Sequence, residues 1–234
     1  MGLTHSPRIV TDGLVLCLDA ANSRSYPGTG TTWTDLSAVE NSASLINGTA
    51  FDTANAGSLS FDGTDDYVSI TAPHPQYETL IVWAKSNTEN WNKYGWISSS
   101  RRENGHVIHP WQNSKLVRFY IANASASSNA NFDANSNSSL AYTPSDITVP
   151  IMYTFTVESD TLRKMYINGS FVQQNTSTIT RASSPTAQEW FFGLDHYGGG
   201  RYGNGHIYMV LNYNRALSAD EIRQNYEATA GRYT

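Results

Sequence analysis

The stretch Leu59-Ser-Phe-Asp-Gly-Thr-Asp-Asp-Tyr-Val-Ser-Ile70 contains the pattern that decides the fold. Apolar residues alternate with polar ones up to Phe61, the dipeptide Asp62-Gly63 interrupts them, and the alternation resumes at Tyr67. Alternation is typical of strands with one buried face, and Asp-Gly between two such runs is a strong signal for a hairpin. We therefore predict that this stretch forms two paired strands joined by a turn.

Further apolar and alternating runs of strand length recur along the whole chain. They occupy residues 13–18, 79–85, 94–99, 105–109, 115–121, 151–157, 162–174, 189–194 and 206–211. Those in the central part follow one another at the spacing of about 8–12 residues that is typical of sandwiches. The sequence therefore predicts an all-β fold in which two antiparallel sheets pack face to face.

The dipeptide Asn168-Gly169 predicts a second hairpin. Both residue types tolerate the positive φ angles that a type I′ turn requires, and apolar runs flank them on each side. In a two-residue loop of this kind Tyr166 faces Phe171, and Met165 faces Val172. These pairs place apolar side chains opposite each other, which supports the register.

The end of the chain changes from strand to helix periodicity. Ser218, with Glu221 three residues later, forms a capping box, and we predict a short helix over 218–230. We interpret the whole chain, residues 1–234, as a single β-sandwich domain that includes this helix. Residues 1–12 form an N-terminal arm, and the Ala/Ser/Asn-rich segment 122–139 forms a surface loop or an edge hairpin.

Composition excludes several classes of function. The chain has 234 residues, of which 15% are charged, and a net charge of −5, so nucleic acid is not expected as a partner. Its single cysteine, Cys17, excludes an internal disulfide. No run approaches the ~18 apolar residues that cross a bilayer, and the first twenty residues lack a secretory signal pattern. We therefore expect neither membrane association nor a signal peptide.

Aromatic residues in predicted loops give the main indication of ligand binding. Flat rings pack against the CH faces of a sugar while their polar groups form hydrogen bonds. The alternative is that these rings pack in the core or within their own loops, and for Trp96, inside a predicted strand, we favour the core. The candidate ligand-binding residues are Trp91, Tyr94, Trp111, Tyr197, Arg201 and Tyr202.

The carboxylates of the opening stretch are candidate metal ligands. Asp62, Asp65 and Asp66 offer oxygen atoms of the kind that calcium prefers. Because Asp is common in turns, where it accepts hydrogen bonds from nearby backbone, we favour that role and predict no cofactor, with calcium near Asp62 and Asp65 as the alternative. His106 and His109 lie an odd number of positions apart on a predicted strand, so they face opposite sides and do not bind one zinc ion together.

Several motifs together resemble those of a known family. Residues 13–22, 32–36 and 59–68, and later 166–169 and 213–222, are similar to the laminin-G-like branch of the concanavalin A-like lectin/glucanase superfamily. The two terminal motifs Gln224-Asn-Tyr226 and Gly231-Arg-Tyr233 resemble a subset of the family found in virion proteins of tailed phages, notably cyanophages. The resemblance implies a jelly-roll sandwich, often with one face that binds sugars.

The resemblance leads to three hypotheses about function. The first is a non-enzymatic capsid decoration or cement subunit, present in the virion after synthesis in the host cytoplasm. Its partners would be the major capsid protein, other virion proteins and further copies of this chain. The second is a tail-fibre or surface adhesin that binds host glycans. The third is a glycoside hydrolase, which we do not favour because the Glu-x-Asp-x-Glu strand motif of related glucanases is absent, so no catalytic residue is predicted.

Overall fold

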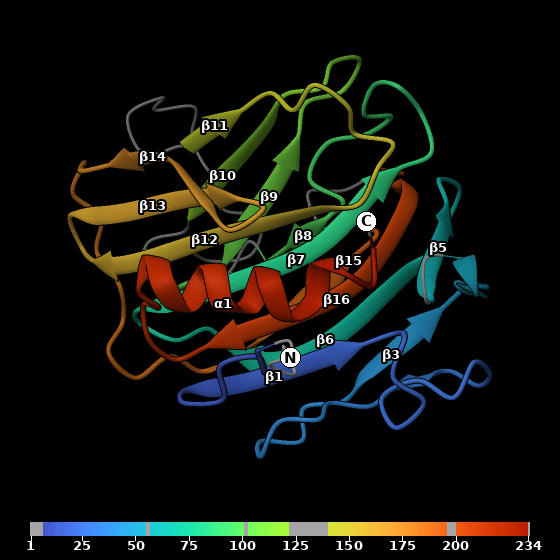
Figure 1. The fold of residues 1–234 in the computed structure, drawn as a ribbon, viewed down its shortest axis with the longest axis horizontal. Helices are drawn as coiled ribbons and strands as arrows, with labels where there is room; N and C mark the ends of the chain where they lie inside the picture. The colour runs from blue at the N-terminus through green and yellow to red at the C-terminus, as the bar shows by residue number, and fades with distance from the viewer. Residues whose placement is uncertain (1–6, 55–56, 101–102, 122–139, 196–199, 234) are drawn as a thin grey trace, which may run out of the picture.

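The computed structural model describes residues 7–54, 57–100, 103–121, 140–195 and 200–233. Within these ranges the chain is nearly all β, and two antiparallel sheets of eight strands each pack face to face (Figure 1). The predicted jelly-roll sandwich with one short C-terminal helix is confirmed.

The two sheets draw their strands from the whole length of the chain. Sheet A consists of β1 (Leu14–Asp19), β4 (Ala50–Asp52), β5 (Ser58–Asp62), β7 (Glu78–Ser86), β12 (Ile151–Ser159), β13 (Leu162–Ile167), β14 (Ser170–Asn175) and β16 (Asn204–Tyr213). Sheet B consists of β2 (Thr32–Trp33), β3 (Ala43–Ile46), β6 (Tyr67–Pro73), β8 (Ser98–Ser99), β9 (His106–Pro110), β10 (Val117–Ile121), β11 (Leu140–Tyr142) and β15 (Ala187–Phe192).

The opening stretch crosses from one sheet to the other. Strand β5 pairs with β4 and β16 in sheet A, whereas β6 pairs with β3 and β15 in sheet B. The predicted alternation is confirmed, because Phe61 and Val68 are both buried in the core between the sheets. The prediction that the two strands pair with each other is wrong. The connection, with Gly63 at a φ of 82° and the Asp66 carboxylate accepting from the Asp62 N–H, carries the chain across the core.

The second predicted hairpin forms, with one change of register. Asn168 and Gly169 have φ angles of 49° and 76°, as a type I′ turn requires, and Tyr166 faces Phe171. Met165 faces Gln173 and not Val172, because the register shifts between Met165 and Tyr166. The extra residue is a β-bulge, and it lets the Val172 side chain pack against the core.

The segment 94–99 was predicted as a strand, but only Ser98 and Ser99 are in one. The preceding backbone bends to bury Trp96, whose ring lies directly against Gly203 and Gly205 at the start of β16. Any side chain at either glycine would clash with this ring, so the two glycines are required by close packing. The predicted core position of Trp96 is confirmed.

Trp91 is also buried, and this differs from its predicted role as a surface residue. Its exposed fraction is 0%, its ring centroid lies 5.7 Å from that of Trp96, and its Nε1–H donates to the Lys115 carbonyl at 3.1 Å. Two backbone hydrogen bonds, between Trp91 and the residues Asn113 and Ser114, hold the loop against the β9–β10 connection. These hydrogen bonds fix the loop in a conformation that directs the Trp91 side chain into the core.

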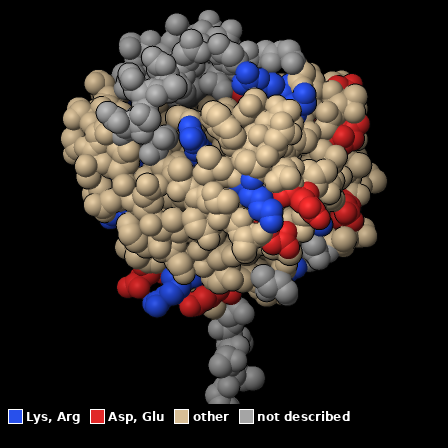
Figure 2. All heavy atoms as spheres, turned by 90° about the horizontal axis from the view of Figure 1, so that it is seen from above, with Lys and Arg blue, Asp and Glu red and all other residues tan. Residues whose placement is uncertain are grey.

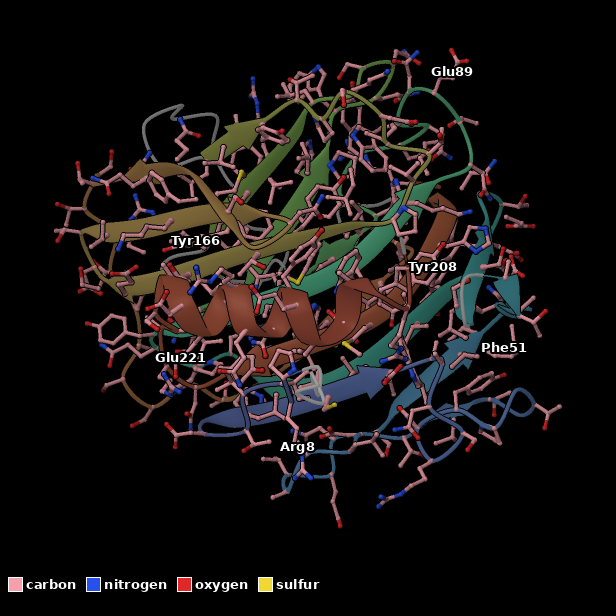
Figure 3. The ribbon with its side chains drawn as sticks, viewed as in Figure 1. Arg8, Phe51, Glu89, Tyr166, Tyr208 and Glu221 are labelled. Atoms are coloured by element: carbon pink, nitrogen blue, oxygen red, sulfur yellow. The ribbon has the colours of Figure 1, made fainter. Side chains whose placement is uncertain are left out.

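Helix α1 (Ala219–Ala230) covers the outer face of sheet A (Figure 1). The predicted capping box of Ser218 and Glu221 is present. Below the helix a second hydrophobic cluster includes Tyr166 and Tyr208 (Figure 3), and the ring of Trp83 on β7 stacks on the Tyr226 ring of the helix. Within the described ranges, no helix has the length and apolar character needed to cross a membrane.

Replacing the helix cap tests how much the capping box stabilises the fold. Ser218→Ala is expected to lower the free energy of unfolding by about 1 kcal/mol, because the Glu221 N–H loses its acceptor. Urea unfolding measures the change, and Ser23→Ala on an exposed turn is the matched control. Equal stability of the two variants would contradict the prediction.

Replacing Trp91 tests its place in the core. Trp91→Ala is expected to lower the free energy of unfolding by about 3–5 kcal/mol, because the change leaves a large cavity. Trp111→Ala, at a partly exposed tryptophan, is expected to cost no more than about 1 kcal/mol. Comparison of the two variants by urea unfolding is the measurement, and a Trp91 variant as stable as the Trp111 variant would show that the ring is not buried in solution.

Candidate functional site

Aromatic side chains gather on the outer face of sheet B, at the end of the β9–β10 hairpin. Ile108 points into the core, so His109 points outward, and Arg118 lies directly opposite His109 on β10. The ring of Tyr94 stacks on His109 with centroids 5.3 Å apart and meets the ring of Trp111 edge-on at 5.5 Å. We call the group Tyr94, His109, Trp111, Arg118 and Tyr120 the aromatic platform.

The platform is partly exposed and carries positive charge. Trp111 has an exposed fraction of 38%, one of the largest for a hydrophobic residue among those described. The Arg118 guanidinium lies over the Trp111 ring, 4.5 Å from its centroid, and donates to the Tyr120 hydroxyl at 3.2 Å. Among the described residues Arg118 forms no ion pair.

A second guanidinium borders the platform at Tyr94. The Arg201 guanidinium lies 5.3 Å from the Tyr94 ring centroid and forms an ion pair of 2.9 Å with Asp195. The other carboxylate oxygen of Asp195 accepts a hydrogen bond from the Ser99 hydroxyl at 3.1 Å. Asp195 therefore holds Arg201 in place beside the ring.

The structure brings only some of the predicted site residues together. Tyr94, Trp111 and Arg201 meet at the platform, whereas Trp91 lies beneath it in the core. Tyr202 is half-buried and its ring lies 6.4 Å from that of Tyr67; no ring contact among the described residues joins it to the platform. Tyr197 lies outside the described residues.

Sequence reasoning missed His109, Arg118 and Tyr120. The signal was present, because all three lie on outward-facing positions of strands that the pattern predicts. A hairpin register that pairs residue 109 with residue 118 would have shown that they meet, but no turn dipeptide between the two strands fixes that register.

On the face in Figure 2 the surface is dominated by uncharged residues, and the acidic side chains lie toward the right side and at the lower left, with basic side chains next to some of them. This distribution matches the low content of charged residues, 15% of the chain. A surface of this kind suits a neutral or weakly charged ligand better than a polyanion.

The carboxylates of the β5–β6 connection behave as turn residues. An oxygen of Asp62 accepts from the Thr64 N–H at 2.7 Å, and this hydrogen bond, with further bonds in the turn, holds the pKa of Asp62 below its usual range. The carboxylate of Asp66 accepts from the Asp62 N–H at 3.1 Å. Oxygen atoms of Asp62, Asp65 and Asp66 lie within 4.8 Å of one another, and both the predicted absence of a cofactor and the alternative of calcium near Asp62 and Asp65 stay predictions.

Comparison with solved structures gives the same overall fold. The binding domain of botulinum neurotoxin serotype D is 15% identical, with a TM-score of 0.67 over 93% of this chain and 52% of that one. The binding domain of Paraclostridial Mosquitocidal Protein 1 is 13% identical, with a TM-score of 0.65 over 92% and 52%. Trypanosoma rangeli sialidase in complex with sialic acid is 14% identical, with a TM-score of 0.65 over 99% and 37%.

This chain therefore spans about half the length of the two binding domains and a smaller share of the sialidase. Comparison with curated protein sequences gives no match. Residues 62–223 match the family model described as the concanavalin A-like lectin/glucanases superfamily, which is more than half of the chain. With the two-sheet sandwich, this match shows that the chain belongs to the concanavalin A-like lectin/glucanase superfamily.

Proposed function

We propose that this chain is a single carbohydrate-binding domain that recognises glycans through the aromatic platform. The observation that carries the proposal is the partly exposed Trp111 ring, flanked by the ring of Tyr94 and by the guanidinium of Arg118, which forms no ion pair among the described residues. Aromatic rings pack on the CH faces of a sugar, and a guanidinium donates to its hydroxyl or carboxylate oxygens. The platform therefore provides the two kinds of contact that sugar recognition needs.

The structural neighbours support a binding role more directly than a capsid-decorating one. Two of them are named as binding domains, and one of the related neurotoxin structures is described as a receptor binding domain. A third was solved with sialic acid. These similarities concern the fold, so the location of the glycan site rests on the residues of this chain.

We propose further that the domain does not catalyse glycoside hydrolysis. Most glycosidases need two carboxyl groups on either side of the bond that is cleaved. Among the described residues, Asp195 is the one carboxylate that contacts the platform or the arginine beside it. It already forms an ion pair with Arg201 and accepts a hydrogen bond from Ser99. A glycosidase activity would be detected as release of reducing sugar during incubation of glycans with a high concentration of the protein.

Replacing the exposed tryptophan tests glycan binding. Trp111→Ala is expected to weaken binding to the best ligands of a glycan array by about tenfold or more, because one stacking ring is worth roughly 1.4 kcal/mol. Phe171→Ala is the matched control, since Phe171 is an aromatic residue on sheet A with an exposed fraction of 53%. The proposal would be contradicted if the protein bound no glycan on the array, or if both variants lost the same amount of binding affinity.

A phage particle is the setting that we propose for this domain. The two terminal motifs that resemble virion proteins are both ordered parts of the fold. Arg232 forms an ion pair of 2.6 Å with Asp19 on β1, and the Tyr233 ring lies 4.9 Å from that of Trp83. A domain of this kind can bind a glycan with one surface and another virion protein with a different one, so a decoration subunit and an adhesin are compatible roles.

Whether this chain is part of a phage particle can be measured directly. Mass spectrometry of purified phage particles is expected to detect this chain at a fixed ratio to the major capsid protein or to a tail protein. That ratio distinguishes a decoration subunit, with many copies, from a tail adhesin, with few. Absence of the chain from purified particles would exclude both virion roles and leave the glycan-binding proposal unaffected.

A further inference from the structure

We infer that His74, Glu78 and His106 form a binding site for a divalent transition-metal ion that prefers imidazole ligands, such as Zn²⁺. The site lies inside the sandwich and is separate from the aromatic platform. The inference does not rest on the proposed glycan binding.

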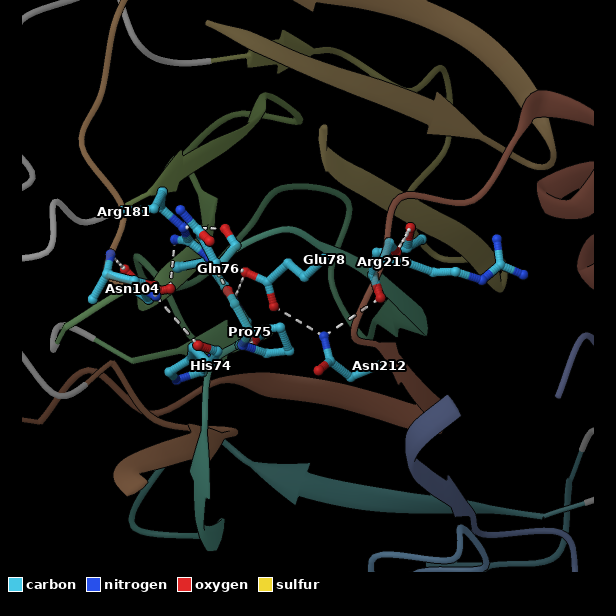
Figure 4. A network of polar contacts seen from close by, with 12 residues as sticks. His74, Pro75, Gln76, Glu78, Asn104, Arg181, Asn212 and Arg215 are labelled. Carbon is cyan, nitrogen blue, oxygen red and sulfur yellow. Dashed lines mark hydrogen bonds and ion pairs between the residues drawn. The ribbon is translucent and has the colours of Figure 1, made fainter. Parts of the chain in front are cut away.

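The three residues come from different elements and meet in the interior, and Figure 4 shows two of them, His74 and Glu78. Glu78 begins β7 in sheet A, His106 begins β9 in sheet B, and His74 directly follows β6. Their exposed fractions are 1%, 0% and 0%. Each residue offers one ligand atom, and these atoms lie within 4.8 Å of one another. An ion at this point would connect the two sheets.

The spacing of two of the donor atoms already suits a tetrahedral ion. Metal bonds of about 2.05 Å place neighbouring ligand atoms about 3.4 Å apart in a tetrahedral site. His106 Nδ1 and Glu78 Oε1 are separated by 3.4 Å. A nitrogen of His74 lies within 4.8 Å of these two atoms, so its ring would have to move closer to complete the tetrahedral set.

The imidazole of His74 gives an independent indication of a ligand. Neither of its ring nitrogens has a hydrogen-bond partner among the described residues, although the side chain is completely buried. Burial of an unpaired polar group costs about 1–3 kcal/mol, so native structures contain few of them. A metal ion bound to one nitrogen would remove part of this cost.

The surroundings orient the other two ligands. His106 Nε2 lies 3.1 Å from the Ser98 hydroxyl, which accepts from the Trp190 indole N–H at 2.6 Å, so Nδ1 faces Glu78. Glu78 accepts from Asn212 at 3.0 Å through its second oxygen. Hydrogen bonds of this kind, from groups just outside the ligands, fix the ligands in known metal sites.

The charge of Arg181 limits which ion binds. Its guanidinium donates to Glu78 Oε1 at 2.9 Å and to the carbonyls of Pro75, Gln76 and Asn104, so it is fixed beside the site. A divalent ion adds two positive charges next to one carboxylate and one arginine. Ions with high affinity for imidazole, such as Zn²⁺ and Co²⁺, tolerate this better than Ca²⁺ or Mg²⁺, which need several oxygen ligands.

A cavity of about 310 Å³ lies beside the site. Its wall includes Pro73 and Pro75, which flank His74, and Asn212, which donates to Glu78. It also includes Trp190, whose ring lies 5.0 Å from those of His74 and His106. The three ligands do not line this cavity, so an ion reaches them only when the residues between the cavity and the site move.

Metal titration of the intact protein tests the inference. After treatment with a chelator, Zn²⁺ at a hundredfold excess over its Kd is expected to raise Tm by about 5–10 °C, whereas Ca²⁺ leaves Tm unchanged at this site. Co²⁺ is expected to give the intense visible absorption of a tetrahedral site, with one ion per chain by mass spectrometry of the metal content. No Tm change and no Co²⁺ absorption would overturn the inference.

Two variants locate the binding. His74→Leu is expected to fold with equal or higher stability without metal, because it replaces unpaired nitrogens by an apolar side chain, and to lose the Zn²⁺ response. His109→Gln on the outer face of sheet B is the matched control and is expected to keep the response. If His74→Leu keeps the full Zn²⁺ shift, or if the variant fails to fold and the Co²⁺ spectrum of the unmodified protein is octahedral, the inference is wrong.

Discussion

The carboxylate of Glu78 is buried between the sheets, with an exposed fraction of 1%, and the structure around it is arranged to offset that burial. Burial alone would raise the pKa of Glu78, but His106 and the Arg181 guanidinium hold that pKa well below its usual range, so the group is ionised. Arg181 is itself satisfied by three backbone carbonyls. Because these groups come from both sheets and from the connections between them, the network fixes how the sheets meet at this end. Breaking either partner of such a pair leaves an uncompensated buried charge, which is costly.

Near the aromatic platform, packing between tryptophan rings and glycines fixes the position of the loop that contains Tyr94. Trp96 lies against Gly203, and Trp91 lies against Trp96, so the loop that contains Tyr94 is held down at both sides. Tyr94 is thereby directed toward His109 and Trp111. The buried Trp91 contributes to the platform through this support and not through contact with a ligand.

Local patterns predicted those features that depend on neighbouring residues. Alternation identified the inward faces of β5 and β6, and Asn168-Gly169 identified a hairpin with the correct turn. Alternation says which face is buried but not which strand is the partner, so it did not reveal that β5 and β6 belong to opposite sheets. The same limit applies to the candidate site. Tyr94 and Trp111 were found from their loops, whereas Arg118 joins them only through the pairing of β9 with β10.

The asymmetry of the two outer faces gives a physical reason to place binding on sheet B. Helix α1 covers the outer face of sheet A, where Trp83 and Tyr166 are buried beneath it. The aromatic residues beneath the helix therefore stabilise it, whereas Phe171 on β14 of the same sheet is 53% exposed and has no cation over its ring among the described residues. On sheet B the partly exposed Trp111 and the unpaired Arg118 have no such cover among the described residues. An exposed ring and a cation without an ion pair among the described residues contribute little to folding stability, so the platform is the part of this face on which the proposed glycan binding rests.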